Sequence, residues 1–205
     1  AFDNKREDNL REKLAEERKE KAEYAKKVGQ LTMQVGRRKA GRYMREMDIT
    51  YIPMKHGFLY LTAIIDWYSR CIVGWDVDDT PDTTMVINAC KKAFKVAKPL
   101  IINSDQGSQF TSDKYIDFIR NNGIWQSMDG KSRWADNIMI ERWFRSFKYE
   151  EAYLTEYANL KEAREAIGRD IYTYNFERCH QSIGNKRPAE VYYPVMRLEA
   201  ARAAA

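Results

Sequence analysis

The stretch MDITYIPMKHGFLYLTAIIDWYSRCIVGWDV, residues 47–77, decides the fold. It contains three segments rich in Ile, Val, Thr, Tyr and Phe, the residue types that favour strands: 47–53, 58–66 and 70–77. The spacers between them, which include 56–57 and 67–69, have the lengths that hairpin turns use. The pattern predicts three consecutive antiparallel strands.

The residues that follow alternate between helical and strand patterns. Segment 82–97 has apolar side chains at helical spacing, and Pro99 ends it before the apolar strand 100–102. Further elements are expected at about 112–122 (helix), 124–128 (strand), 136–150 (helix) and 159–177 (helix), with a loop at 129–133. This order is that of the ribonuclease H-like fold. We therefore predict an α/β protein with a mixed five-stranded sheet flanked by helices.

The N-terminal residues 4–35 are dense in Lys, Glu, Arg, Ala and Leu, which predicts one long helix. Six apolar side chains fall on one heptad seam: Leu10, Leu14, Tyr24, Val28, Leu31 and Val35. Glu17 and Lys21 interrupt that seam with charge. Two interpretations stay open, a self-associating coiled coil and a single helix packed on the core.

The charge of the chain is concentrated near its start. The net charge is +5, and residues 1–40 carry 12 Lys and Arg against 8 Asp and Glu. The glycine-containing linker 36–46 includes three consecutive basic residues, Arg37, Arg38 and Lys39. A positive surplus fits a polyanionic partner, and this linker is a candidate for contacts with DNA phosphates.

Cysteine usage and hydropathy exclude several classes of protein. Cys71, Cys90 and Cys179 are far apart and lack metal-ligand spacing, so neither a disulfide framework nor a zinc site is indicated. No apolar stretch approaches the roughly 18 residues that span a bilayer, and the first residues are charged rather than signal-like. We expect a cytoplasmic protein with no membrane partner.

Three carboxylates, each at the end of an apolar run, carry the candidate chemistry. Asp48 lies in the first predicted strand, Asp105 at the carboxyl end of the fourth, and Glu141 on the helix after the fifth. In a ribonuclease H-like sheet the first and fourth strands are neighbours, so Asp48 and Asp105 can share a cation. The helix after the fifth strand would bring Glu141 to the same site. Phosphoryl transfer uses two metal ions held by carboxylate oxygens. A lone Asp after a strand is most often a turn residue, so the prediction rests on all three acids.

Basic residues accompany the third acid. Arg145 and Lys148 follow Glu141 by four and seven positions, so all three project from one helical face. A surface salt bridge and contacts with DNA phosphates are both open interpretations. Other candidates for DNA contact are Lys131, Arg133 and Arg142. Trp125, Trp134 and Trp143 could stack on bases, although core packing is favoured.

Five motifs together resemble a known family: MDITYIP, GFLYLTAIIDWYSR, NSDQGSQFTS, DNIMIERWFRSFKYE and YNFERCHQSIGNKRPAEVYY. They are similar to the integrase core of the IS-three group of bacterial insertion-sequence transposases, relatives of retroviral integrases. The resemblance runs from about residue 48 to 193. It implies that Asp48, Asp105 and Glu141 form the Asp-Asp-Glu triad, and that Lys148 is the basic residue seven positions beyond the glutamate.

The resemblance also implies a function and partners. A DNA transposase would catalyse metal-dependent 3′-end cleavage and strand transfer by a copy-out, paste-in pathway, using two Mg²⁺ ions with Mn²⁺ as a substitute. Its partners would be terminal inverted repeats, target DNA and at least one further copy joined through the N-terminal helix, in the bacterial cytoplasm at the nucleoid. We expect four regions: a coiled coil 1–35, a basic linker 36–46, a catalytic core 47–195 and a tail 196–205.

The sequence departs from the family pattern in several places. Family members usually carry helix-turn-helix segments before the zipper and another DNA-binding stretch after it, whereas about ten residues join zipper and core here. Arg45 replaces a common Trp, and Cys179 replaces a common Pro. An alternative function is therefore a catalytically silent DNA-binding or dimerising fragment that regulates a full-length transposase. A ribonuclease on RNA–DNA hybrids would require a richer acidic cluster.

Two further residues that match the family pattern, Asp66 and His180, are expected to have structural or local roles. Asp66 is expected to be a structural ion-pair partner. His180 is expected to organise its loop or to neighbour the active site.

Overall fold

The computed structural model describes residues 43–55, 57–128 and 137–193. In these segments five strands form one sheet in the order β3-β2-β1-β4-β5. Their bounds are β1 Met44–Pro53, β2 Phe58–Asp66, β3 Ile72–Asp78, β4 Ile101–Ser104 and β5 Trp125–Met128. The first three strands pair antiparallel, whereas β4 pairs parallel with both β1 and β5. The predicted mixed five-stranded sheet is confirmed.

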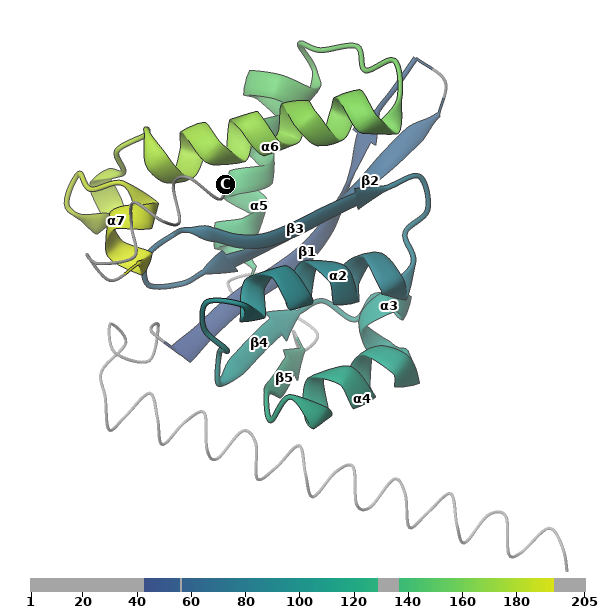
Figure 1. Ribbon diagram of the computed structural model, residues 1–205, viewed down its shortest axis with the longest axis vertical. Coiled ribbons are helices and arrows are strands. Elements are labelled where there is room, and N and C mark those ends of the chain that lie inside the picture. The colour runs from purple at the N-terminus through teal and green to yellow at the C-terminus, as the bar shows by residue number, and fades with distance from the viewer. Residues whose placement is uncertain (1–42, 56, 129–136, 194–205) are drawn as a thin grey trace, which may run out of the picture. The chain divides into compact units, whose positions relative to one another are not determined.

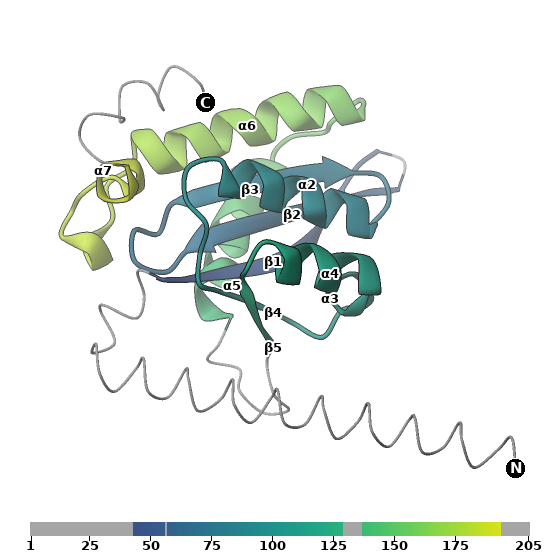
Figure 2. The ribbon, with the colours of Figure 1, turned by 60° about the horizontal axis from the view of Figure 1, so that its bottom comes forward.

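Helices cover both faces of this sheet. They are α2 Thr83–Phe94, α3 Ser108–Thr111, α4 Asp113–Asn121, α5 Ile138–Phe147, the π-helical η2 Lys148–Ala152, α6 Leu160–Phe176, the 3₁₀ η3 Gln181–Ile183 and α7 Pro188–Tyr192. Figure 1 shows α2 in front of the sheet and α5 behind it, and Figure 2 shows the same layers after a turn. One buried cluster joins α2 and α4 to the sheet, and a second joins α5 and α6 to its other face.

The contact between α2 and β3 is close because of one glycine. A Cβ atom on Gly74 would lie 2.3 Å from the Ala89 carbonyl oxygen and 2.8 Å from the Ala93 Cβ. Such distances are too short for any side chain, so the helix backbone rests directly on the strand. Ala89 and Ala93 supply the small side chains on the facing side of α2, and both are buried.

The observed elements differ from the predicted ones mainly at their ends. The third strand begins at Ile72 rather than at residue 70, because a tight turn precedes it: the Arg70 N–H donates to the Asp66 carbonyl, and Arg70 has a positive φ of 67°. The predicted helix 136–150 becomes α5 followed by a π-helical turn. The short α3 and α7 were not predicted.

Several predictions concern residues outside the described segments. They are the N-terminal coiled coil, Arg37, Arg38 and Lys39 of the linker, Lys131, Arg133 and Trp134 of the loop, and the C-terminal tail. Within the described part of the chain, no helix has the length and apolar character needed to cross a membrane.

Candidate active site

The parallel pairing of β1 with β4 ends two residues before two of the predicted acids. Glu46 pairs with Asn103 in the parallel register of these strands. Asp48 and Asp105 each come two residues later, and side chains two apart point to the same face of a sheet. Asp105 directly follows Ser104, the last residue of β4. Continued at this register, the pairing would set the two aspartates next to each other, but Asp105 lies beyond the last residue of β4.

Two residues before each aspartate, Glu46 and Asn103 form hydrogen bonds to the start of α5, the helix that carries Glu141. The Ile140 N–H donates to Glu46 Oε2 over 2.9 Å, and Asn103 Nδ2 donates to Asn137 Oδ1 over 3.4 Å. The first N–H groups of a helix have no partner within the helix, and Asn137 makes no capping bond with its own side chain. Glu46, on a different element, supplies an acceptor instead. The next residue after Ile140 is Glu141.

The Glu46 side chain is buried, with 1% of its surface exposed. Burial raises its pKa to about 7, while hydrogen bonds from the Ile140 backbone, the Trp67 side chain and the Met139 backbone act in the opposite direction. A charged carboxylate is costly to bury, and these donors together with the nearby Arg70 offset part of that cost.

Asp48 and Glu141 line one pocket of about 370 Å³. Its other lining residues are Thr50, Phe144, Arg145, Lys148, Tyr149 and Tyr153. Asp48 is half-buried, and its Oδ1 accepts from the Ile49 N–H over 2.7 Å. Glu141 is exposed on α5. The structure thus brings together a strand-borne and a helix-borne acid that are 93 positions apart in the sequence.

Asp105 is not among the residues that line this pocket. Its side chain is exposed, and its Oδ1 accepts from the Gly107 N–H over 2.9 Å. Among residues 43–55, 57–128 and 137–193, no three side chains of Asp, Glu, His or Cys gather closely enough to hold one cation. The oxygen donors have the chemistry that Mg²⁺ prefers. Joint coordination by all three carboxylates stays a prediction.

The two predicted basic residues of α5 and η2 lie at the pocket and cover aromatic rings. Lys148 Nζ is 4.3 Å from the centroid of the Tyr51 ring, and the Arg145 guanidinium carbon is 6.0 Å from that of Tyr149. Burial lowers the pKa of Lys148, and the Asp48 carboxylate opposes that shift. Both cations therefore share the pocket with the acids.

Other predicted residues have different surroundings. Arg142 is exposed on α5 but is not a lining residue of the pocket. Trp143 is 3% exposed and packs on Phe144 and Phe147, so it belongs to the core, as favoured from the sequence. Trp125 is 39% exposed on β5.

Asp66 and His180 have the structural roles expected of them. Asp66 is buried, accepts hydrogen bonds from the Ser69 N–H and hydroxyl, and lies 3.9 Å from Arg45 Nε. His180 packs edge-on against Tyr174, with ring centroids 4.6 Å apart. Its backbone N–H donates to the Lys186 carbonyl over 3.0 Å, which closes the loop before α7. Asp66 is thus an ion-pair partner within the fold, and His180 organises its loop.

The sequence did not identify Thr50, Tyr149 or Tyr153 as pocket residues. Thr50 could have been found, because it lies two positions after Asp48 on the same strand. The two tyrosines could not, since they lie in and just after the π-helical turn Lys148–Ala152, where the 3.6-residue period no longer tells which side chains face the pocket.

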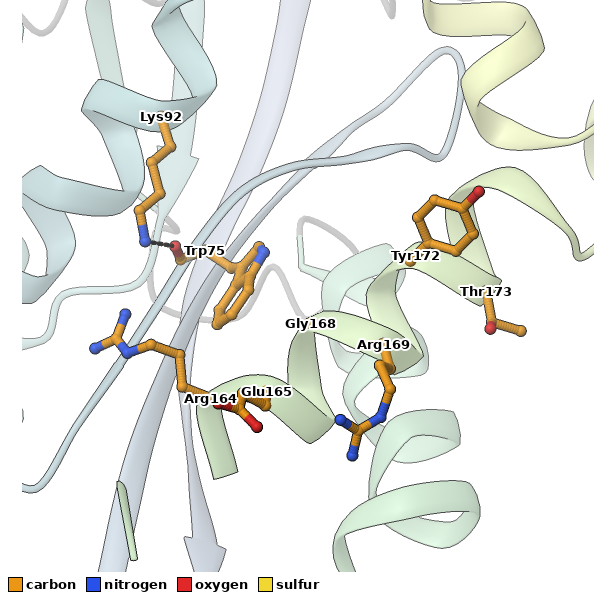
Figure 3. A pocket seen from close by; sticks show the side chains of 8 residues that line it. All are labelled: Trp75, Lys92, Arg164, Glu165, Gly168, Arg169, Tyr172 and Thr173. Atoms are coloured by element: carbon orange, nitrogen blue, oxygen red, sulfur yellow. Dashed lines mark hydrogen bonds between the residues drawn. The ribbon is translucent and has the colours of Figure 1, made fainter. Parts of the chain in front are cut away.

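A larger hollow of about 890 Å³ lies elsewhere, among residues of α2, β3 and α6, and contains none of the three acids. Figure 3 shows the Lys92 amine bonded to the Trp75 carbonyl oxygen, a distance of 3.0 Å. Lys92 and Arg164 also contact the Asp76 carboxylate, at 3.2 and 2.5 Å. Lys92 and Arg164 are therefore engaged within the fold.

Comparison with known proteins agrees with this architecture. Two family models, both described as integrase core domain, match residues 39–133 and 122–188. A transposase for insertion sequence element IS904 from Lactococcus lactis subsp. lactis (strain IL1403) is 36% identical over 147 residues, which are 70% of this chain and 58% of the relative. Transposase InsF for insertion sequence IS3A from Escherichia coli (strain K12) is 28% identical over 147 residues, 70% of this chain and 51% of that protein. The chain spans about half the length of these curated relatives.

Solved structures show the same fold. The catalytic core domain of HTLV-2 integrase in complex with magnesium superposes with a TM-score of 0.60 and 20% identity, covering 74% of this chain and 97% of that one. The catalytic core domain of BIV integrase gives a TM-score of 0.56 and 17% identity over 80% of this chain and 98% of the other. With both integrase core models matched across residues 39–188, the chain belongs to the integrase core domain family, and insertion-sequence transposases are among its relatives.

Proposed function

We propose that this chain is the catalytic part of a DNA transposase, which cleaves 3′ ends and transfers the strand to a new site. One observation carries the proposal: the acids Asp48 and Glu141 share a pocket with the cations Arg145 and Lys148. Negative oxygen donors beside positive side chains suit a phosphodiester group, because the acids can hold cations while the basic residues hold the flanking phosphates. The transposase relatives support the same assignment.

We assign the cation site to Asp48, Asp105 and Glu141, with two Mg²⁺ ions as the expected occupants and Mn²⁺ as a substitute. The bound ions would neutralise charge on the phosphorus and activate the attacking oxygen. Because Asp105 lies outside the pocket of the other two acids, the proposal includes a movement of its side chain toward them. Its exposure and its position beyond the end of β4 leave room for that movement.

The proposed partners are DNA ends, target DNA and further copies of the chain. Arg145 and Lys148 would hold phosphates beside the acids, while Arg37, Arg38, Lys39, Lys131, Arg133 and Arg142 remain candidate contacts. A copy-out, paste-in pathway, assembly through the N-terminal helix and action at the nucleoid belong to the same proposal. Relatives named as transposases for insertion sequences support the choice of DNA.

A strand-transfer assay with labelled DNA ends tests this function. The wild-type chain is expected to join ends with Mg²⁺ or Mn²⁺, and Asp105→Asn to abolish joining while leaving thermal stability and DNA affinity nearly unchanged. Asp117→Asn, an exposed acid on α4, is the matched control and should retain activity. A large loss of stability in Asp105→Asn would identify this acid as structural instead.

A catalytically silent regulatory fragment is the second candidate. The position of Asp105 outside the pocket that Asp48 and Glu141 line favours it. Binding of DNA without any joining of ends would establish this alternative. Cleavage of RNA–DNA hybrids without joining of DNA would instead indicate a ribonuclease.

A further inference from the structure

Four aromatic side chains beside the candidate active site are unusually exposed. Tyr51 and Phe58 are each 54% exposed, Tyr149 is 64% exposed and Tyr153 is 53% exposed. Within the described segments, every other aromatic side chain is less than half exposed, with Tyr43 at 43% and Trp125 at 39%. The largest exposed rings are therefore gathered at one place, which we call the aromatic platform.

The platform consists of two ring pairs joined to the pocket. Tyr51 and Phe58 meet edge to face with centroids 5.6 Å apart, and Tyr149 and Tyr153 do so at 5.7 Å. Lys148 lies over Tyr51, and Arg145 lies over Tyr149. Tyr149 and Tyr153 themselves line the pocket that holds Asp48 and Glu141. Rings, cations and acids thus form one continuous surface.

We propose that the aromatic platform binds unpaired DNA bases next to the reacting phosphate. Exposed rings interleaved with cations are the arrangement by which proteins hold single strands, with bases stacking on rings and cations holding the backbone. A paired duplex hides the faces of its bases, so the platform can act only where the strand has opened. The inference rests on the proposed function, since it takes DNA as the substrate of this site.

The choice of nucleic acid over an apolar protein partner follows from charge. Arg145 and Lys148 lie directly on the platform rings, so an apolar partner that covered the rings would also remove these two cations from water without offering them any polar contact. A DNA strand supplies both components, a flat base for each ring and a phosphate for each cation.

Fluorescence anisotropy with three labelled probes tests the platform in the presence of EDTA. The probes are a blunt duplex, the same duplex with a short 3′ tail of deoxyadenosines, and the same duplex with an abasic tail that keeps the phosphates. The wild-type chain should bind the adenosine tail about tenfold more tightly than the abasic tail, because stacking requires bases. The double variant Tyr149→Leu with Tyr153→Leu should lose that difference and still bind the blunt duplex.

Two control variants define the role of the rings. Tyr149→Phe with Tyr153→Phe keeps the stacking surfaces and should retain the preference for bases. Tyr43→Leu removes an exposed ring at the opposite end of β1 and should also retain it. Circular dichroism melting is expected to be unchanged in all three variants, because the substituted side chains are on the surface.

Each other outcome has a definite meaning. If the wild type binds the adenosine and abasic tails with equal affinity, the proposal that the aromatic platform binds bases is wrong, even if the chain joins DNA ends. Absence of DNA binding altogether overturns the proposed function itself. If the leucine variant changes the oligomeric state in analytical ultracentrifugation but keeps its preference for bases, the rings serve self-association and the inference is wrong.

Discussion

At the scale of single residues, burial sets the ionisation of several carboxyl groups. Asp170 on α6 is an example, since burial and the neighbouring Glu151 raise its pKa to about 6. In the unfolded chain the group has an ordinary pKa near 4. Folding therefore favours the protonated carboxyl. Its stabilising contribution is complete below about pH 4 and is lost as the pH rises through about 6.

Replacing Asp170 with Asn should stabilise the protein at alkaline pH. The variant cannot ionise, so it avoids the cost of a partly buried charge at pH 8, and the free energy of unfolding should rise by about 1 kcal/mol after allowing for solvent screening. At pH 4, where the carboxyl is protonated in both states, the two proteins should be nearly equal. Urea denaturation at both pH values measures the difference. A stability gain of the same size at pH 4 would contradict this account.

Single residues also explain why the candidate site was only partly predictable. Asp48, Asp105 and Glu141 could be selected because each lies at the end of an apolar run. Glu46 could not, since its role depends on Ile140, a contact across 94 positions in the sequence. A buried acid in a strand looks the same in the sequence whether its partner is a helix start or an arginine.

At the scale of elements, the start of α5 is held by residues of two strands rather than by its own cap. Removing the acceptor with Glu46→Ala should leave the Ile140 N–H without a partner and cost about 1–3 kcal/mol. Amide hydrogen exchange at Ile140 should accelerate relative to amides of α4. Glu46→Gln keeps an oxygen acceptor and should protect Ile140 better than Ala does. Equal exchange at Ile140 in the wild type and the Ala variant would show that the cap is dispensable.

Two glycines give a matched test of how helices pack on β3. Gly74→Ala places a Cβ 2.3 Å from the Ala89 carbonyl oxygen, a backbone atom that can yield only if α2 moves, so we expect a loss of about 1–3 kcal/mol. Gly168→Ala in α6 places its Cβ 3.5 Å from the Trp75 ring, which is ordinary contact. Because alanine favours helices, this variant should gain about 0.5–1 kcal/mol. Thermal melts measure both effects. If the melting temperatures of the two variants shift in the same direction, the packing argument is wrong.

At the scale of the whole molecule, the order of the elements was predictable and their fine geometry was not. The strand and helix periodicities, together with the helix end marked by Pro99, were sufficient to predict the sheet and its main helices. The four-residue α3 and five-residue α7 are too short to show a period. The π-helical turn η2 changes the helical phase, and this is why Tyr149 and Tyr153 could not be assigned to the pocket from the sequence.

The molecule's long-range electrostatics can be tested through Lys148. If this side chain holds a DNA phosphate, Lys148→Ala should weaken binding similarly for all duplex sequences and reduce the slope of log affinity against log salt by about 1. Lys98→Ala, an exposed residue between α2 and β4, is the matched control and should leave the slope unchanged. Titrations at several salt concentrations measure both. An unaltered slope in Lys148→Ala would argue against the phosphate contact.

The π-helical turn after α5 has a consequence for how such a site can diversify. Each residue of an ordinary helix turns the chain by about 100°, and the wider turn Lys148–Ala152 offsets that rotation locally. Deleting one residue there would swing Tyr153 and its successors to another side while leaving Asp48 and Glu141 in place. Insertions or deletions in this one turn could therefore change which side chains contact a substrate without moving the acids proposed to carry the chemistry.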